Sequence, residues 1–114
     1  MKRRVAVTGM AGISPIGNDW PSVRARLGDY RNAVKRMAEW SEYDGLHTQL
    51  GAPAAEFALS DRYTTKSMRS MGRVALMATR ASELALSDAG LADDPLIKSG
   101  HLGIAYGSSA GTPK

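Results

Sequence analysis

The chain has 114 residues and a mass of 12.2 kDa, with 43% hydrophobic and 23% charged residues, an ordinary globular composition. It contains no cysteine, which excludes thiol catalysis, zinc–thiolate sites and disulfides within these residues. A formal net charge of +4 favours an acidic partner but is too modest to predict nucleic-acid binding. No apolar run approaches the roughly 18 residues needed to span a bilayer, so we expect a cytoplasmic protein without a signal peptide or membrane span.

The first third of the chain is predicted to form a buried strand, a glycine-rich loop and a short helix. Residues 5–8 are mainly β-branched and are followed by glycine, as is typical of a buried strand. Asn18 or Asp19 is suited to cap the helix, and Pro21 is tolerated in its first turn. Gly28 stands where a left-handed residue would end that helix.

The rest of the chain is predicted to contain a long helix and a second strand. Residues 29–59 show no dominant period and are interpreted as mostly irregular, with a possible strand at 49–52. Between about 65 and 89, apolar residues recur at steps of three and four, which predicts one long helix ending at Gly90. Because its apolar side is rich in Ala and Met, we expect this helix to be deeply buried. Residues 102–106 predict another strand.

These elements indicate an α/β protein, but they are too few to enclose a core. Two clear strands and one apolar helix would leave sheet edges and a helix face uncovered. We therefore expect residues 1–114 to be part of a larger α/β protein and not a complete independent domain.

The loop after the first strand has some features of a phosphate-binding loop. Gly9 and Gly12 follow Thr8 with part of the dinucleotide-binding spacing, and Asp29 lies about 20 residues on, where a ribose ligand could stand. Pro15, however, occupies the third glycine position and delays the helix whose N-terminus would bind the pyrophosphate. A nicotinamide-dinucleotide-binding oxidoreductase is thus the less favoured alternative.

The same stretch resembles the opening of the β-ketoacyl synthases that act on acyl carrier protein, the condensing enzymes of fatty acid and polyketide synthesis. Val7-Thr8-Gly9 and Ser14-Pro15-Ile16-Gly17 match the family in identity and spacing. The chain departs from the family pattern at Ala11, where the family has its second glycine, although Gly12 stands beside it.

Two later segments resemble the same family, at residues 66–71 with the helix that closes at 87–91, and at residues 102–108. The ordered matches therefore extend over the whole chain. The resemblance implies a thiolase-like fold, layered α-β-α-β-α when complete, of which residues 1–114 would be part of the N-terminal half. It also implies a homodimer.

The resemblance implies an acyltransferase that condenses an acyl thioester with malonyl thioester on acyl carrier protein, with loss of carbon dioxide. The family's catalytic cysteine and its two histidines would lie beyond Lys114, so no catalytic residue is assigned here and the chain alone is expected to be inactive. His47 and His101 are interpreted as ordinary loop histidines, and no metal or cofactor is expected. The alternative within the family is a non-catalytic ketosynthase-like partner that sets chain length in a heterodimer.

Lys66 and Arg69 form a candidate binding surface. Their i, i+3 spacing puts both on one helix face, with Arg62 and Arg73 nearby. In the family, basic residues at the positions of Lys66 and Arg69 help to dock the acidic carrier protein. A solvated helix face without a partner is an equally weighted interpretation.

Ala110 stands where the family places a residue that shapes the acyl pocket. A small side chain there would leave room for a longer acyl chain. A loop that needs small residues for tight packing would explain Ala110 equally well.

Overall fold

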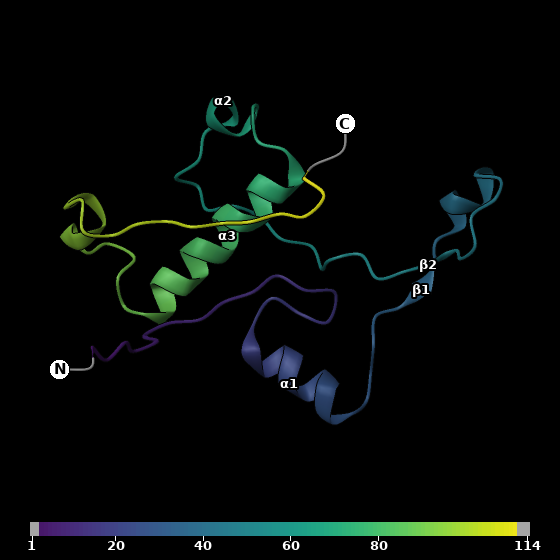
Figure 1. The fold of residues 1–114 in the computed structure, drawn as a ribbon, viewed down its shortest axis with the longest axis horizontal. Coiled ribbons are helices and arrows are strands. Elements are labelled where there is room, and N and C mark those ends of the chain that lie inside the picture. The colour runs from purple at the N-terminus through teal and green to yellow at the C-terminus, as the bar shows by residue number, and fades with distance from the viewer. Residues whose placement is uncertain (1–2, 112–114) are drawn as a thin grey trace. The chain divides into compact units, whose positions relative to one another are not determined.

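The computed structural model describes residues 3–111, which divide into two units (Figure 1). The first unit comprises the residues up to Gly12 and those from Phe57 onward, and the second comprises residues 13–56. In chain order, the elements are α1 (Trp20–Gly28), β1 (Lys35–Arg36), the 3₁₀-helix η1 (Ala38–Glu42), β2 (Leu50–Gly51), α2 (Thr65–Met68), α3 (Arg73–Asp88) and the 3₁₀-helix η2 (Pro95–Lys98).

Helix α1 in the second unit begins as the sequence predicts. The Asp19 carboxylate accepts a hydrogen bond from the backbone N–H of Ser22 at 2.8 Å, and Pro21 lies in the first turn. The predicted role of Gly28 as a left-handed terminator is wrong. Gly28 is the last helical residue, and it is Tyr30 that takes the positive φ of 55°.

A two-residue antiparallel pair, β1 with β2, lies in the same unit and confirms part of the strand predicted at 49–52. Arg36 donates from Nε and Nη2 to Gln49 Oε1 at 3.1 and 2.9 Å. Gly51 lies against η1, since a Cβ placed there would stand 2.9 Å from both Met37 Cγ and Trp40 Cη2. The absence of a side chain at Gly51 therefore allows the Trp40 ring to pack against this pair.

The prediction of one helix over 65–89 is wrong, because the chain forms α2 and α3 in the first unit with an interruption between them. Helix α2 already ends at Met68 with Arg69 as its C-cap, and Gly72, in an extended conformation with φ −72° and ψ 169°, is the N-cap at which α3 begins. The predicted C-terminus is confirmed, since α3 ends at Asp88 and Gly90 has φ +72°.

The two predicted strands of the first unit are extended segments without ladder partners. Residues 3–9 approach the C-terminal end of α3, and residues 101–109 run along this helix (Figure 1). The Tyr106 hydroxyl donates to the Ala78 carbonyl of α3 at 2.9 Å. A ladder requires a neighbouring strand, and among residues 3–111 only β1 and β2 provide one for each other.

No residue between 3 and 111 is buried in this structure. The expectation of a deeply buried helix is therefore wrong for the described chain, in which the inner residues of α3 are only half-buried. Val5 is 95% exposed and Ile104 is 78% exposed, so the extended segments present apolar side chains to solvent. None of the helices described over 3–111 has the length and apolar character to cross a membrane.

Candidate functional site

The structure brings the predicted basic pair together on one helical turn. Lys66 lies in α2, and Arg69 continues the turn as its C-cap with φ −58° and ψ −30°. Both residues are exposed, and neither forms an ion pair within the described range 3–111. The i, i+3 spacing on helical backbone puts both side chains on the same side of the turn.

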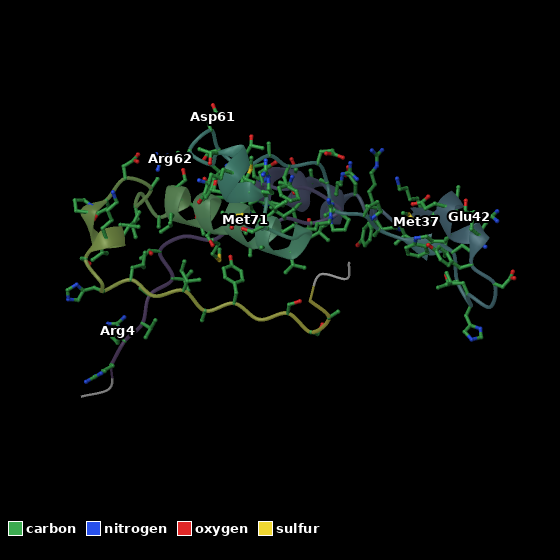
Figure 2. The ribbon with its side chains drawn as sticks, turned by 90° about the horizontal axis from the view of Figure 1, so that it is seen from above. Arg4, Met37, Glu42, Asp61, Arg62 and Met71 are labelled. Atoms are coloured by element: carbon green, nitrogen blue, oxygen red, sulfur yellow. The ribbon has the colours of Figure 1, made fainter. Side chains whose placement is uncertain are left out.

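The two other basic residues of the predicted patch are engaged elsewhere. Arg62, labelled in Figure 2, donates from Nη2 to Asp93 Oδ1 at 2.6 Å. The Arg73 guanidinium lies 5.8 Å from the centre of the Phe57 ring, within the range of a cation–π contact. Of the four basic residues in the predicted patch, Lys66 and Arg69 therefore remain as the candidate contacts for a partner.

A half-buried polar cluster that the sequence analysis missed lies on α3. Ser60 donates its hydroxyl to Glu83 Oε1 at 2.5 Å, and Arg80 Nη1 lies 3.0 Å from Glu83 Oε2. Burial raises the pKa of Glu83, but the hydrogen bonds from Ser60 and Arg80 outweigh it and hold the pKa below its ordinary value. The i, i+3 spacing of Arg80 and Glu83 was the available sequence signal, whereas nothing local points to Ser60.

An open hollow of about 660 Å³ lies beside this cluster. It is lined by residues 60 and 62–63, by α3 through Arg80, Glu83 and Leu86, and by residues of the 92–98 segment. Its charged groups include the ion pairs already described, so its polar lining serves to hold these segments together.

Ala110 lies in the loop that follows the second extended segment. The backbone N–H of Gly111 donates to Ser108 Oγ at 3.0 Å, and Gly111 has φ +66°, so the loop makes a tight turn. Ala110 is exposed and does not line the hollow. Immediately before the loop, the Tyr106 hydroxyl also lies 3.0 Å from Ser82 Oγ, which ties this part of the chain to α3.

The first glycine loop contacts α3 in a way that argues against phosphate binding. A Cβ on Gly9 would lie 2.5 Å from the Ala85 carbonyl oxygen, so Gly9 serves a close approach to the helix. The backbone N–H of Met10 donates to Asp88 Oδ2 at 2.8 Å. A phosphate at this loop would have to displace the Asp88 carboxylate or lie beside its like charge. The contacts that Gly9 and Met10 make with α3 therefore argue against the dinucleotide-binding alternative.

Both histidines are exposed, as expected for ordinary loop residues. His101 Nδ1 lies 3.1 Å from Ser99 Oγ, a short-range loop contact. Among residues 3–111, no group of three or more His, Asp and Glu side chains is arranged to hold a metal ion.

Comparison with a solved structure identifies the class of protein. The crystal structure of a beta-ketoacyl synthase from Burkholderia phymatum STM815 superposes with a TM-score of 0.86 at 49% sequence identity, covering 95% of this chain and 26% of that one. The segment thus has the fold of the corresponding part of a thiolase-like α/β protein. Residues 2–114 match the family described as "Beta-ketoacyl synthase, N-terminal domain". The chain belongs to the β-ketoacyl synthase family.

Curated relatives agree with this assignment. Nodulation protein E of Rhizobium sp. (strain N33) is 33% identical over 94 residues, which are 82% of this chain and 23% of that protein. Nodulation protein E of Rhizobium meliloti (strain 1021) is 34% identical over 92 residues, 80% of this chain and 22% of that protein. The chain spans about a quarter of the length of these relatives.

Proposed function

We propose that the full-length protein carrying residues 1–114 is an acyltransferase that condenses an acyl thioester with malonyl thioester on acyl carrier protein, in fatty acid or polyketide synthesis. The observation that carries the proposal is the family match over residues 2–114. The 49% identity to a solved β-ketoacyl synthase supports it. Because residues 1–114 contain no cysteine, this segment would supply framework and contact surfaces, with the catalytic residues beyond Lys114.

The proposed reaction has two carbonyl-addition stages. A cysteine thiolate attacks the acyl thioester carbonyl, and the carrier thiol leaves. Malonyl thioester then loses carbon dioxide, and its enolate attacks the acyl-enzyme carbonyl, which releases the cysteine thiolate and forms the 3-oxoacyl thioester. Two histidines would polarise the malonyl carbonyl, while backbone N–H groups hold the oxyanion. A full-length protein without this cysteine would instead favour the non-catalytic chain-length partner.

We place residues 1–114 within the N-terminal half of a fold layered α-β-α-β-α, in a cytoplasmic homodimer. The exposed apolar side chains of residues 5–8 and 102–106 support this placement, since strands of a layered sheet need neighbours to cover them. Size-exclusion chromatography with light scattering on the full-length protein should give the mass of a dimer. A monomer at micromolar concentration would contradict the pairing.

Lys66 and Arg69 are proposed to bind the acidic surface of acyl carrier protein. Both are exposed on one helical turn, and neither has an acidic partner within the described residues. Long-range attraction between such cations and an acidic protein speeds encounter and weakens with added salt. This contact would bring the acyl thioester to the enzyme.

A double charge reversal tests the docking proposal. Lys66→Glu with Arg69→Glu in the full-length protein should raise the KM for acyl carrier protein substrates by about ten-fold or more, with a smaller difference at high salt. Arg24→Glu with Arg31→Glu makes the same change in charge on exposed residues of the other unit and should leave KM within about two-fold. Equal effects of the two double variants would contradict a local docking surface.

Ala110 is proposed to border the acyl pocket and to leave room for longer chains. Ala110→Ile should shift the preferred acyl substrate to shorter chains, because one branched side chain removes the volume of several methylene groups. Ser109→Ala, next to it in the same loop, should leave the chain-length profile unchanged. An unchanged profile for Ala110→Ile would refute the assignment.

A further inference from the structure

The basic pair stands on a loop whose two ends meet. We call residues 57–73 the docking loop. It begins at Phe57 and ends at Arg73, where the guanidinium and the aromatic ring are 5.8 Å apart. Helix α2, with Lys66 and Arg69, occupies its middle. The two ends of the docking loop are therefore close together, as in the compact surface loops that often carry function.

Among residues 3–111, contacts from Arg62 and from Ser60 fasten the docking loop to the rest of its unit, and the two residues are shielded to different degrees. Arg62 donates from Nη1 to the Ala92 carbonyl at 3.4 Å as well as to Asp93. Arg62 and Asp93 form an ion pair, but their side chains are 65% and 80% exposed, so water and salt screen it strongly. The hydrogen bond from Ser60 to Glu83 is better protected, because the Glu83 side chain is only 19% exposed. Glu83 therefore provides the stronger of the two contacts.

Glu83 is itself held in place. Arg80, one turn earlier on α3, binds the second carboxylate oxygen at 3.0 Å, so each oxygen of Glu83 has a separate partner. The lowered pKa of the Glu83 carboxyl agrees with a charge that accepts these bonds. At neutral pH the group is ionised, so the bond from Ser60 goes to a charged acceptor, which is stronger than a bond to a neutral one.

We propose that Glu83 is a positioning residue for carrier-protein docking, holding the docking loop through Ser60 so that Lys66 and Arg69 meet the carrier together. The inference rests on the docking surface proposed above. Without this contact the docking loop would sample other orientations, and only a fraction of molecules would present the helical turn that carries both cations in the correct orientation. Apparent affinity falls in proportion to that fraction, while the complex that does form is unchanged.

The inference predicts a split between two kinds of substrate. Glu83→Ala in the full-length protein should raise KM for acyl carrier protein thioesters about three- to ten-fold and leave kcat within about two-fold. The same acyl group on N-acetylcysteamine, a small thiol without the acidic surface of the carrier protein, should react with unchanged kcat/KM. Glu83→Gln retains an oxygen that can accept from Ser60 and should recover part of the loss.

Matched variants separate positioning from general damage. Glu42→Ala removes an exposed glutamate from the other unit and should change neither substrate. If Glu83→Ala fails to fold, Ser60→Ala removes the hydroxyl bond to Glu83 from the loop side but keeps the backbone N–H of Ser60, and it should show the same split to a smaller extent. Equal losses with carrier and small-thiol substrates, or no loss with either, would overturn the inference.

The double variant of Lys66 and Arg69 shows which proposal fails. If it lowers carrier-dependent turnover while Glu83→Ala does not, the positioning role is wrong and the docking surface stands. If the double variant has no effect, the docking surface is wrong and the positioning role falls with it. If the double variant and Glu83→Ala each raise KM for carrier substrates only, the docking surface and the positioning role are both supported.

Discussion

Replacing Gly9 with alanine tests how closely the first extended segment packs on α3. The added Cβ would lie 2.5 Å from the Ala85 carbonyl oxygen, 2.6 Å from the Ala89 nitrogen and 2.8 Å from the Ala89 Cβ. Two of these atoms are backbone atoms and the third is the Cβ of Ala89, the C-cap of α3, so none of them can rotate away. The extended segment must move instead.

The loss in the free energy of unfolding on Gly9→Ala is the balance of opposing effects. Overpacking of this kind costs about 1–3 kcal/mol, and displacing Met10 from its 2.8 Å hydrogen bond with Asp88 adds about 1 kcal/mol. Alanine also restricts the unfolded chain, which returns about 0.4–1 kcal/mol. Gly9→Ala should therefore destabilise the full-length protein by about 1–3.6 kcal/mol.

Urea denaturation of the full-length protein measures this loss, with Gly12→Ala as the control. A Cβ on Gly12 meets nothing within 4 Å, and Gly12 has no positive φ. Gly12→Ala should therefore be neutral or slightly stabilising. Equal unfolding midpoints for the two variants would refute the close approach of Gly9 to α3.

Three other predictions concern individual polar side chains. Tyr106→Phe removes the hydroxyl that donates to the Ala78 carbonyl and also contacts Ser82 Oγ, and it should cost about 1 kcal/mol. The loss should be seen as faster amide exchange in residues 102–108, and unchanged exchange would contradict it. The pKa of Glu83 is lowered on folding, so its stabilisation is complete above the ordinary value of about 4.5 and is lost as the pH falls through the folded value. Glu83→Gln should flatten the acid limb of a stability–pH curve below about pH 5, and an unaltered limb would exclude this linkage. Asp19→Ala should fray the start of α1, measured by amide exchange at Ser22, whereas Asp19→Asn should retain the cap.

Local rules predicted the features that depend on neighbouring residues. The start of α1 follows from a capping Asp19 with proline just inside, and the end of α3 follows from Gly90 in a left-handed conformation. The interruption before α3 was missed because the apolar period continues through it. Only Gly72 marked the break, and glycine is tolerated inside helices often enough to hide it.

Features that depend on distant residues were beyond local rules. Residues 5–8 and 102–106 carry strand composition, yet pairing requires neighbours that residues 3–111 do not provide for them. The candidate site likewise contains residues that local rules could find and a contact that they could not. Lys66 and Arg69 could be found by spacing and resemblance, whereas the Ser60–Glu83 hydrogen bond joins residues 23 positions apart.

The most direct test of the central claim is a condensation assay on the full-length protein. The protein would be supplied with an acyl thioester and malonyl-loaded acyl carrier protein, and products on the carrier would be measured by mass spectrometry. We predict a 3-oxoacyl carrier product two carbons longer than the acyl substrate, released with one equivalent of carbon dioxide and abolished when the catalytic cysteine is replaced. A full-length protein that binds both substrates but forms no 3-oxoacyl product would contradict the proposed function.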